Sequence, residues 1–261
     1  MTKVDQAREL GIARSTLYYQ SKQEAKDWKT KQLIEEVLEQ YPSYGHKRIA
    51  LHLGINKKRV LRVMKIYGIK PYRRRSKKWK KVPKNEGKTY SNLLRIETPQ
   101  GPGDIYVSDF THVVYRGAWV YIATILDIYT RECVGVSVLS THATILVSSC
   151  YLNAILHRAP PRIIHSDQGS EYKSHEYTTL VEQRGTLISM SAPGCPWENG
   201  YQESFYDKLK VDLGDPNRFD SLGELVAEIY RLIYVYNTTR IHTSLGMSPL
   251  QFAQRQKHVI I

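Results

Sequence analysis

The sequence is short of cysteine and has none of the spacings by which cysteines bind a metal or cross-link a small domain. Its three cysteines, Cys133, Cys150 and Cys195, are an odd number and lie far apart, with no CxxC pair. This pattern argues against a disulfide framework and against a structural zinc site, and it suits a reducing cytoplasm.

Long apolar runs are also missing. No stretch of the 261 residues reaches the length needed to span a bilayer, and no signal-peptide pattern opens the chain. We therefore expect no association with a membrane. The length is enough for one main domain with a sizeable core and for smaller appendages.

Acidic residues are scarce in the first third of the chain, although the whole chain carries a net charge of only +13. Residues 1–90 hold 24 Lys and Arg against 8 Asp and Glu, whereas residues 91–261 hold 14 against 17. The N-terminal third therefore carries the entire excess. A basic arm on a near-neutral body indicates a module that binds a polyanion and is attached to a second domain.

The first 22 residues resemble half of a helix-turn-helix. An apolar helix end runs into Leu10-Gly11-Ile12, and a second helix is expected near Arg14. A short helical hairpin that caps the next domain fits these residues equally well.

Residues 23–70 are the better candidate for a helix-turn-helix. A helix is expected over 25–40, and after the turn at Gly54 the side chain of Asn56 is expected to cap a helix that ends at Tyr67. That helix places Val60, Val63, Met64 and Tyr67 on one face. The alternative is a helix whose charged face is merely solvated. The predicted DNA contacts in this region are Lys47, Arg48, Lys57, Lys58, Arg59 and Arg62.

Residues 71–99 are expected to form a basic linker. From Lys70 to Lys84 there are many cations and no acid, so the run repels itself and is expected to stay extended until it meets phosphate. Tyr72 and Trp79 could stack on bases or sugars. The alternative is a tether that only solubilises the chain. The predicted DNA contacts are Arg73, Arg74, Arg75, Lys77, Lys78 and Lys80.

Beyond residue 100 the pattern changes to strands that alternate with helices. Apolar, β-rich runs at Ile105–Val114 and Trp119–Ile128 flank a hairpin signal at Arg116-Gly117. The order predicts an α/β domain with a mixed five-stranded sheet over residues 100–215, followed by a C-terminal helical segment, 216–261. The other expected strands are Glu132–Leu139, Arg162–Ser166 and Thr186–Ser189, and the expected helices are His142–His157 and Ser174–Arg184. The inner stripe of the helix His142–His157 is expected to be Ile145, Leu146, Ser149, Leu152 and Leu156.

Three acids in this domain stand where an acid is hard to explain structurally. Asp109 lies inside the first strand, Asp167 directly follows a buried strand, and Glu203 lies in a helix after a loop rich in Pro and Gly. A carboxylate in a central strand is costly unless it is paired or bound to a metal. Each acid has an ordinary alternative, since Asp109 could pair with a cation, Asp167 could cap the turn at Gly169, and Glu203 could be a surface acid.

Such a trio has a clear chemical use. Phosphodiester cleavage and strand transfer place negative charge on the attacking and leaving oxygens, which two Mg²⁺ ions roughly 3.5–4 Å apart can stabilise together. Hard divalent ions prefer carboxylate oxygens, and one acid can bridge the pair with one further acid on each side.

The motifs around these acids resemble those of a known family. Between Asp167 and Glu203 lie 35 residues, and the motifs His165-Ser166-Asp167-Gln168-Gly169-Ser170 and Glu203-Ser204-Phe205-Tyr206 surround the two acids. Together with Tyr44-Gly45-His46-Lys47-Arg48-Ile49 and the tail from Tyr236 to Pro249, they make the chain similar to the OrfB-type DDE transposases. These belong to the IS-three insertion-sequence family, in the retroviral-integrase superfamily.

This resemblance implies an RNase H-like catalytic core in which Asp109, Asp167 and Glu203 bind two Mg²⁺ ions, or Mn²⁺ in their place. It implies a DNA transposase that binds double-stranded transposon ends, cleaves strands and joins 3′-hydroxyls to target DNA. It also implies a homo-oligomer on DNA, a possible DNA-binding product of an upstream frame as partner, and a bacterial, nucleoid-associated location. The retroviral His/Cys zinc module is absent from the sequence, Glu198 stands where Asp is usual, and Gly200 stands where Ala is common.

Four further residues have weaker functional interpretations. Lys210 falls on the same helical face as Glu203 and, like Lys208, is a predicted phosphate contact, with an exposed cation as the alternative. Asp127 is expected to be structural. Arg240 is expected to brace the C-terminal helix, with DNA contact as the less favoured role.

Two other functions fit parts of the sequence. A regulatory DNA-binding protein could keep the fold without catalysis, but the trio of acids is intact. A hybrid-cleaving nuclease of the RNase H type could use the same acids, but it would need no basic helix-turn-helix arm. The sequence therefore favours the transposase.

Overall fold

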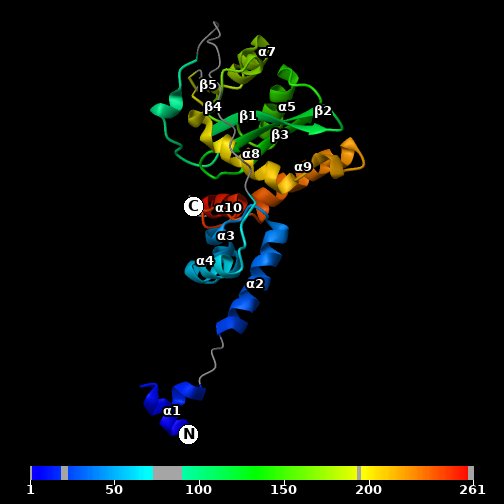
Figure 1. Ribbon diagram of the computed structural model, residues 1–261. Coiled ribbons are helices and arrows are strands. Elements are labelled where there is room, and N and C mark those ends of the chain that lie inside the picture. Colours follow the sequence, from blue (N-terminus) through cyan, green and yellow to red (C-terminus); the bar gives the residue numbers. More distant parts are fainter. Residues whose placement is uncertain (1, 19–22, 73–89, 193–194, 258–261) are drawn as a thin grey trace. The chain divides into compact units, whose positions relative to one another are not determined.

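The computed structural model describes residues 2–18, 23–72, 90–192 and 195–257 (Figure 1). The chain divides into two compact units, Met1–Pro71 and Tyr72–Ile261. Among the described residues, no helix is both long enough and apolar enough to cross a membrane. Six predicted DNA contacts lie outside the described residues: Arg73, Arg74, Arg75, Lys77, Lys78 and Lys80.

The N-terminal unit is helical, with α1 at Lys3–Glu9, α2 at Gln23–Gln40, α3 at His46–Leu53 and α4 at Lys57–Ile66. Gly54 ends α3 in the left-handed conformation, at φ 64°, which a residue without a Cβ adopts at little cost. The side-chain oxygen of Asn56 then accepts the Lys58 N–H at 2.8 Å and caps α4. The bounds of α3 and α4 and the turn between them follow the sequence prediction closely, and Val60, Val63 and Met64 form the buried face of α4.

The opening segment differs from the expected half helix-turn-helix. Helix α1 is capped by Thr2, but the second helix expected near Arg14 is a five-residue 3₁₀ helix, η1, at Arg14–Tyr18. Such helices are short and have poorer hydrogen-bond geometry than α-helices. A recognition helix is therefore not formed by the described residues of this segment.

A mixed five-stranded sheet organises the second unit, in the order β3-β2-β1-β4-β5. Strands β1 (Ile105–Tyr115) and β2 (Ala118–Asp127) pair antiparallel, and β3 (Cys133–Leu139) pairs antiparallel with β2. Strands β4 (Ile163–Ser166) and β5 (Leu187–Met190) extend the sheet in parallel on the other side of β1. The β1–β2 turn uses Arg116 and Gly117 at φ 48° and 83°, as the hairpin signal predicts.

Helices cover both faces of the sheet (Figure 1). On one face lie α5 (Thr144–Ile155), the short α6 (Ser170–Lys173) and α7 (His175–Glu182). On the other face lie α8 (Gly200–Leu213) and α9 (Leu222–Thr238), and α10 (Pro249–Lys257) follows. The expected α/β architecture is confirmed, and β1 is its central strand.

The inner stripe predicted for α5 is right for Leu146, which is buried, and wrong for three of its other members. Ile145, Leu152 and Leu156 of that stripe are exposed, and the buried side chains are Leu146, Val147, Cys150, Tyr151 and Ala154. The reason is close packing on β3. A Cβ at Gly135 would lie 2.6 Å from the Cys150 carbonyl oxygen and 2.8 Å from the Ala154 Cβ, so small residues face the sheet there.

Two residues with proposed structural roles have them. Asp127 accepts hydrogen bonds from the backbone N–H groups of Gly103, Tyr129 and Thr130 at 2.8, 2.7 and 3.2 Å, and it organises the turn after β2. Arg240 is buried and forms an ion pair with Asp212 of α8, so it braces the C-terminal segment.

Candidate active site

Asp109 lies in the central strand of the sheet, as expected. Its Oδ1 accepts the N–H of Phe110 at 2.8 Å, and the Tyr206 hydroxyl donates to its main-chain carbonyl at 2.5 Å. Burial, then the nearby carboxylate of Asp167 and, more weakly, that of Glu203 raise the pKa of Asp109 to about 8, although the Lys210 ammonium acts in the opposite direction. Asp109 therefore resists ionisation in the protein alone.

Asp167 directly follows β4, at the carboxyl end of that strand. Because β4 pairs in parallel with β1, its end lies beside the middle of β1, where Asp109 is. The Oδ1 of Asp167 accepts the Gly169 N–H at 2.9 Å, so this acid does cap the turn, as the structural alternative supposed. Desolvation nevertheless raises the pKa of Asp167, and the carboxylate of Glu171 adds to the effect.

Gly169 leaves room for the acids beside it. A Cβ at this position would lie 3.1 Å from Asp167 Oδ1 and also 3.1 Å from Glu171 Oε2. Its φ of −55° does not require glycine. The constraint is therefore the space between two carboxylates rather than the backbone conformation.

Glu203 lies in the first turn of α8 and is exposed. The helix is anchored by its buried face, on which Gln202 Nε2 donates to the carbonyls of Val107 and Thr124 at 2.7 and 3.0 Å. The Tyr206 hydroxyl, which donates to Asp109, accepts a hydrogen bond from Thr124 Oγ1 at 2.9 Å. Gln202 and Tyr206 thus bind α8 to β1 and β2 on either side of Glu203.

The register of β1 and β4 places Asp167 beside Asp109, and Glu203 is near enough to act weakly on the charge of Asp109. Among the described residues, no group of three or more His, Cys, Asp or Glu side chains is arranged so that it could hold a metal ion. What the site contains is an accumulation of carboxylate oxygens with one cation, Lys210, near enough to affect Asp109.

Several residues around the acids were not singled out from the sequence for the contacts they make here. Gln202 and Tyr206 could have been found from the helical spacing of Gln202, Phe205, Tyr206 and Leu209, which defines the buried face of α8. No local pattern predicts the hydrogen bond between His142 Nδ1 and Glu171 Oε1, at 2.6 Å, or the ion pair Glu198–Arg95, also at 2.6 Å. Each of these joins segments far apart in the sequence.

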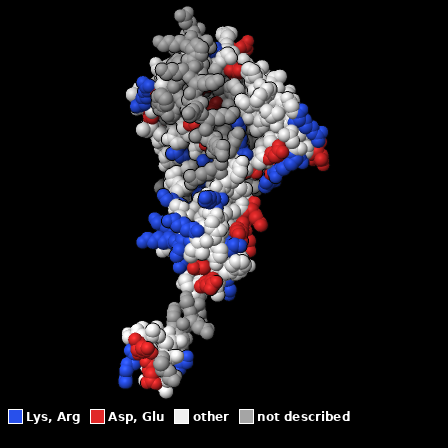
Figure 2. All heavy atoms as spheres, in the orientation of Figure 1, with Lys and Arg blue, Asp and Glu red and all other residues white. Residues whose placement is uncertain are grey.

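The predicted DNA contacts in the N-terminal unit have different environments. Lys47, Lys57 and Lys58 are exposed, and Figure 2 shows Lys and Arg gathered over α3 and α4. Arg48 is partly buried, with its guanidinium 5.8 Å from the Tyr44 ring centre. In the second unit, Lys208 Nζ donates to the Ser204 carbonyl at 3.4 Å.

Arg59 and Arg62 have intramolecular partners in α2. Arg62 Nη2 lies 2.5 Å from Oδ1 of the buried Asp27, and Arg59 Nη2 donates to Thr30 Oγ1 at 2.7 Å. Both arginines remain exposed at the surface, in a shallow pocket that Lys26 and Lys58 also line. They therefore hold α4 against α2, and their contact with DNA stays a prediction.

Comparison with known proteins identifies the family. Two models described as "Integrase core domain" match residues 99–196 and 184–249. The transposase for insertion sequence element IS904 of Lactococcus lactis is 35% identical over 221 residues, which cover 80% of this chain and 87% of that relative. The chain belongs to the IS3-family DDE transposases. A second relative of this transposase, the InsF transposase for insertion sequence IS3A of Escherichia coli, is 31% identical over 169 residues, which cover 63% of this chain and 59% of the relative.

Solved structures confirm the fold of the transposase. The HTLV-2 integrase catalytic core domain in complex with magnesium has a TM-score of 0.50 at 19% identity, covering 60% of this chain and 99% of that one. The simian T-cell lymphotropic virus intasome in complex with the PP2A regulatory subunit B56 gamma has a TM-score of 0.54 at 18% identity, covering 80% and 70%. The RNase H-like catalytic fold implied by the sequence motifs is therefore confirmed, and the chain is a polynucleotidyl-transferase transposase.

Proposed function

We propose that Asp109, Asp167 and Glu203 are the catalytic residues of this transposase and that they bind two divalent cations, Mg²⁺ or Mn²⁺. The observation that carries the proposal is the register of β1 and β4, which places Asp167 beside Asp109; burial and the carboxylates of Asp167 and Glu203 accordingly raise the pKa of Asp109 to about 8. Carboxylates crowded together without matching cations are destabilising unless a bound cation compensates them.

The donor set fits a hard divalent ion. All three side chains offer oxygen, which Mg²⁺ prefers, and none offers sulfur or imidazole. Asp109, Asp167 and Glu203 are the residues that would hold such ions. Bound there, the ions would stabilise the negative charge that develops on the attacking and leaving oxygens during strand cleavage and 3′-hydroxyl strand transfer.

The residues of this chain would supply position and charge. The backbones of β1 and β4 fix Asp109 and Asp167, and the helix α8 carries Glu203. Lys210 adds a positive charge close to Asp109, where it would attract the phosphodiester backbone. We propose that Lys208 and Lys210 contact the transposon end near the site.

The N-terminal unit and the basic linker are the proposed DNA-binding parts. Of the exposed lysines, Lys57 and Lys58 stand at the start of α4, the helix that a helix-turn-helix places in the major groove, and Lys47 stands at the start of α3. Relatives of this fold form assemblies, as the intasome among the similar structures shows for its own protein. We therefore propose that double-stranded transposon ends and target DNA bind to a homo-oligomer of this chain, with an upstream-frame product as a further candidate partner.

A strand-transfer assay tests the catalytic assignment. With end DNA and Mg²⁺, the wild type should cleave and join strands, whereas Asp167→Asn and Glu203→Gln should lose at least about 100-fold of the rate while still binding DNA. Unchanged rates in both variants would refute the assignment of the site. Cleavage of RNA–DNA hybrids without joining would favour a nuclease instead.

A further inference from the structure

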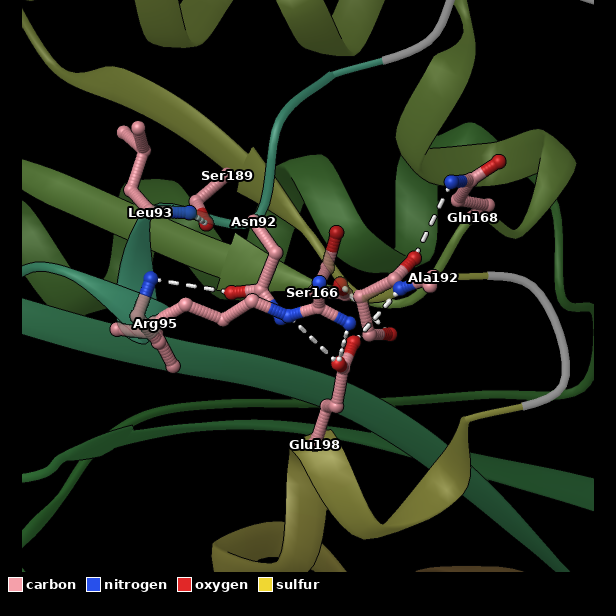
Figure 3. A network of polar contacts seen from close by, with 10 residues as sticks. Asn92, Leu93, Arg95, Ser166, Gln168, Ser189, Ala192 and Glu198 are labelled. Atoms are coloured by element: carbon pink, nitrogen blue, oxygen red, sulfur yellow. Dashed lines mark hydrogen bonds and ion pairs between the residues drawn. The ribbon is translucent and has the colours of Figure 1, made fainter.

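The carboxylate of Glu198 joins two segments that are far apart in the sequence (Figure 3). Its Oε1 accepts hydrogen bonds from Arg95 Nε and Nη2 at 3.1 and 2.6 Å, and its Oε2 accepts the Ala192 N–H at 2.7 Å. Desolvation acts against ionisation, but the hydrogen bonds from Ala192, Arg95 and Asn92 hold the pKa of Glu198 below its ordinary value. The carboxylate of Glu198 is therefore ionised and lies among these groups, with only 10% of the side chain exposed.

The segment that carries Arg95 is itself fixed on the sheet. The Leu93 N–H donates to Ser189 Oγ at 2.9 Å, and the Met190 N–H donates to the Ser91 carbonyl at 3.3 Å, so this segment lies along β5. Ser189 Oγ also bonds Nδ1 of His165 in β4 at 2.8 Å. The segment that carries Arg95 is thus connected, through Ser189 and His165, to β4, the strand that precedes Asp167.

On its other side Glu198 leads into the helix of Glu203. It lies in the 3₁₀ helix η3, Pro196–Asn199, which runs directly into α8. Its bond to Ala192 also ties the end of β5 to the entry of α8. The contacts of Gln202 and Tyr206 fix the buried face of α8, and the contacts of Glu198 fix the residues directly before it, so the first turn with Glu203 is held from both directions.

We propose that Glu198 is a positioning residue for Glu203. Together with Arg95 and Asn92 it forms a latch, which we define as these three side chains, and the latch fixes the place where α8 begins and with it the position of Glu203. The inference rests on the catalytic role proposed for Glu203. Groups that orient metal ligands from behind contribute about 10- to 100-fold to metal affinity or activity.

The test compares Glu198→Gln with a matched control elsewhere in the same unit. Glu228→Gln breaks an ion pair of the same chemistry, in which Arg231 Nε lies 2.6 Å from Glu228 Oε2 and the side chains are 58% and 16% exposed, against 64% and 10% for Arg95 and Glu198. Glu198→Asp keeps the charge on a side chain that is one methylene group shorter. All three variants are full-length chains.

The first readout needs no DNA. Mg²⁺ should raise the Tm of the wild type, of Glu228→Gln and of Glu198→Asp, and the rise should be much smaller in Glu198→Gln. Amide hydrogen exchange over residues 200–204 should be faster in Glu198→Gln alone. The second readout is strand cleavage, for which Glu198→Gln should need about 10-fold more Mg²⁺ for half-maximal rate, with partial recovery in Mn²⁺.

Two results would overturn the proposal. One is an unchanged Mg²⁺ requirement and Tm rise in Glu198→Gln. The other is a loss of activity in Glu198→Gln that equals the loss of folded protein, with the Mg²⁺ requirement unaltered. Glu203→Gln, measured in parallel, separates this failure from that of the catalytic assignment, because a fully active Glu203→Gln would refute the assignment itself.

Discussion

Asp109 shows how a single residue can be costly to the fold and useful to the chemistry. Its backbone is held in the central strand, so the side chain cannot move away from Asp167, and burial raises its pKa to about 8. Sites adapted for function are often destabilising to the protein that carries them. The free energy lost when Asp109 ionises is what a bound cation can recover.

Replacement of Asp109 by Asn should therefore stabilise the metal-free protein. The folded pKa is about 8 and the ordinary value is 3.8, so between these values the folded state binds more protons than the unfolded state. The free energy of unfolding of the wild type then falls as the pH rises through this window. Asn has no such dependence, and at pH 8 we expect Asp109→Asn to be more stable by roughly 1–2 kcal/mol.

Urea denaturation from pH 5 to pH 8 without divalent ions would measure this difference. Asp207→Asn, an exposed position on α8, is the control and should leave the pH profile unchanged. Added Mg²⁺ should reverse the order, since it should stabilise the wild type and not Asp109→Asn. A wild type whose stability does not fall with pH would contradict the raised pKa of Asp109.

Elements of this chain could be predicted well where the signal is local. The β1–β2 hairpin, the cap of α4 at Asn56 and the position of Asp167 after β4 all follow from neighbouring residues. The buried face of α5 was predicted only at Leu146, because apolar residues stand on more than one side of this helix and its close packing on Gly135 of β3 is not visible in the local pattern. The latch was missed for the same reason, since Arg95 and Glu198 meet only in the folded chain.

Helix α4 combines two tasks that its sequence does not distinguish. Lys57, Lys58, Arg59 and Arg62 look alike as a basic helix start, but Arg59 and Arg62 bond Thr30 and Asp27 of α2. Asp27 is buried and its Oδ1 also accepts from Gln23 at 2.8 Å, so loss of Arg62 would leave a buried carboxylate with less compensation.

Two alanine variants should separate these tasks. Lys58→Ala should weaken DNA binding several-fold and leave the Tm unchanged, because Lys58 is exposed and its only predicted partner is phosphate. Arg62→Ala should destabilise the N-terminal unit by about 1 kcal/mol, because it removes a partner of a buried charged group. Thermal unfolding and fluorescence anisotropy with end DNA would measure both, and equal effects of the two variants on Tm would contradict the division of tasks.

At the scale of the whole molecule, charge and chemistry occupy different parts of the chain. The excess of cations belongs to residues 1–90, whereas residues 91–261 hold more acids than bases and contain the candidate catalytic carboxylates. An acidic site repels phosphates, and a separate basic arm offsets this repulsion because it raises the local concentration of DNA. The two functions should therefore respond differently to salt.

Neutralisation of the basic linker should reduce the salt dependence of DNA binding without changing the chemistry. Each phosphate contact contributes about 0.9 to the slope of log K against log salt concentration, so the six-fold Gln variant should lower the slope by up to about 5. The residues replaced are Arg73, Arg74, Arg75, Lys77, Lys78 and Lys80. At low salt and saturating DNA the strand-transfer rate should stay near that of the wild type, because Asp109, Asp167 and Glu203 are untouched.

The control is the double variant Arg184→Gln with Arg255→Gln, which should leave the slope nearly unchanged, since both residues are exposed in the second unit. A linker variant that keeps the wild-type slope would show that the basic linker only tethers the two units. The phosphate contacts that bind DNA would then have to come from the N-terminal helices.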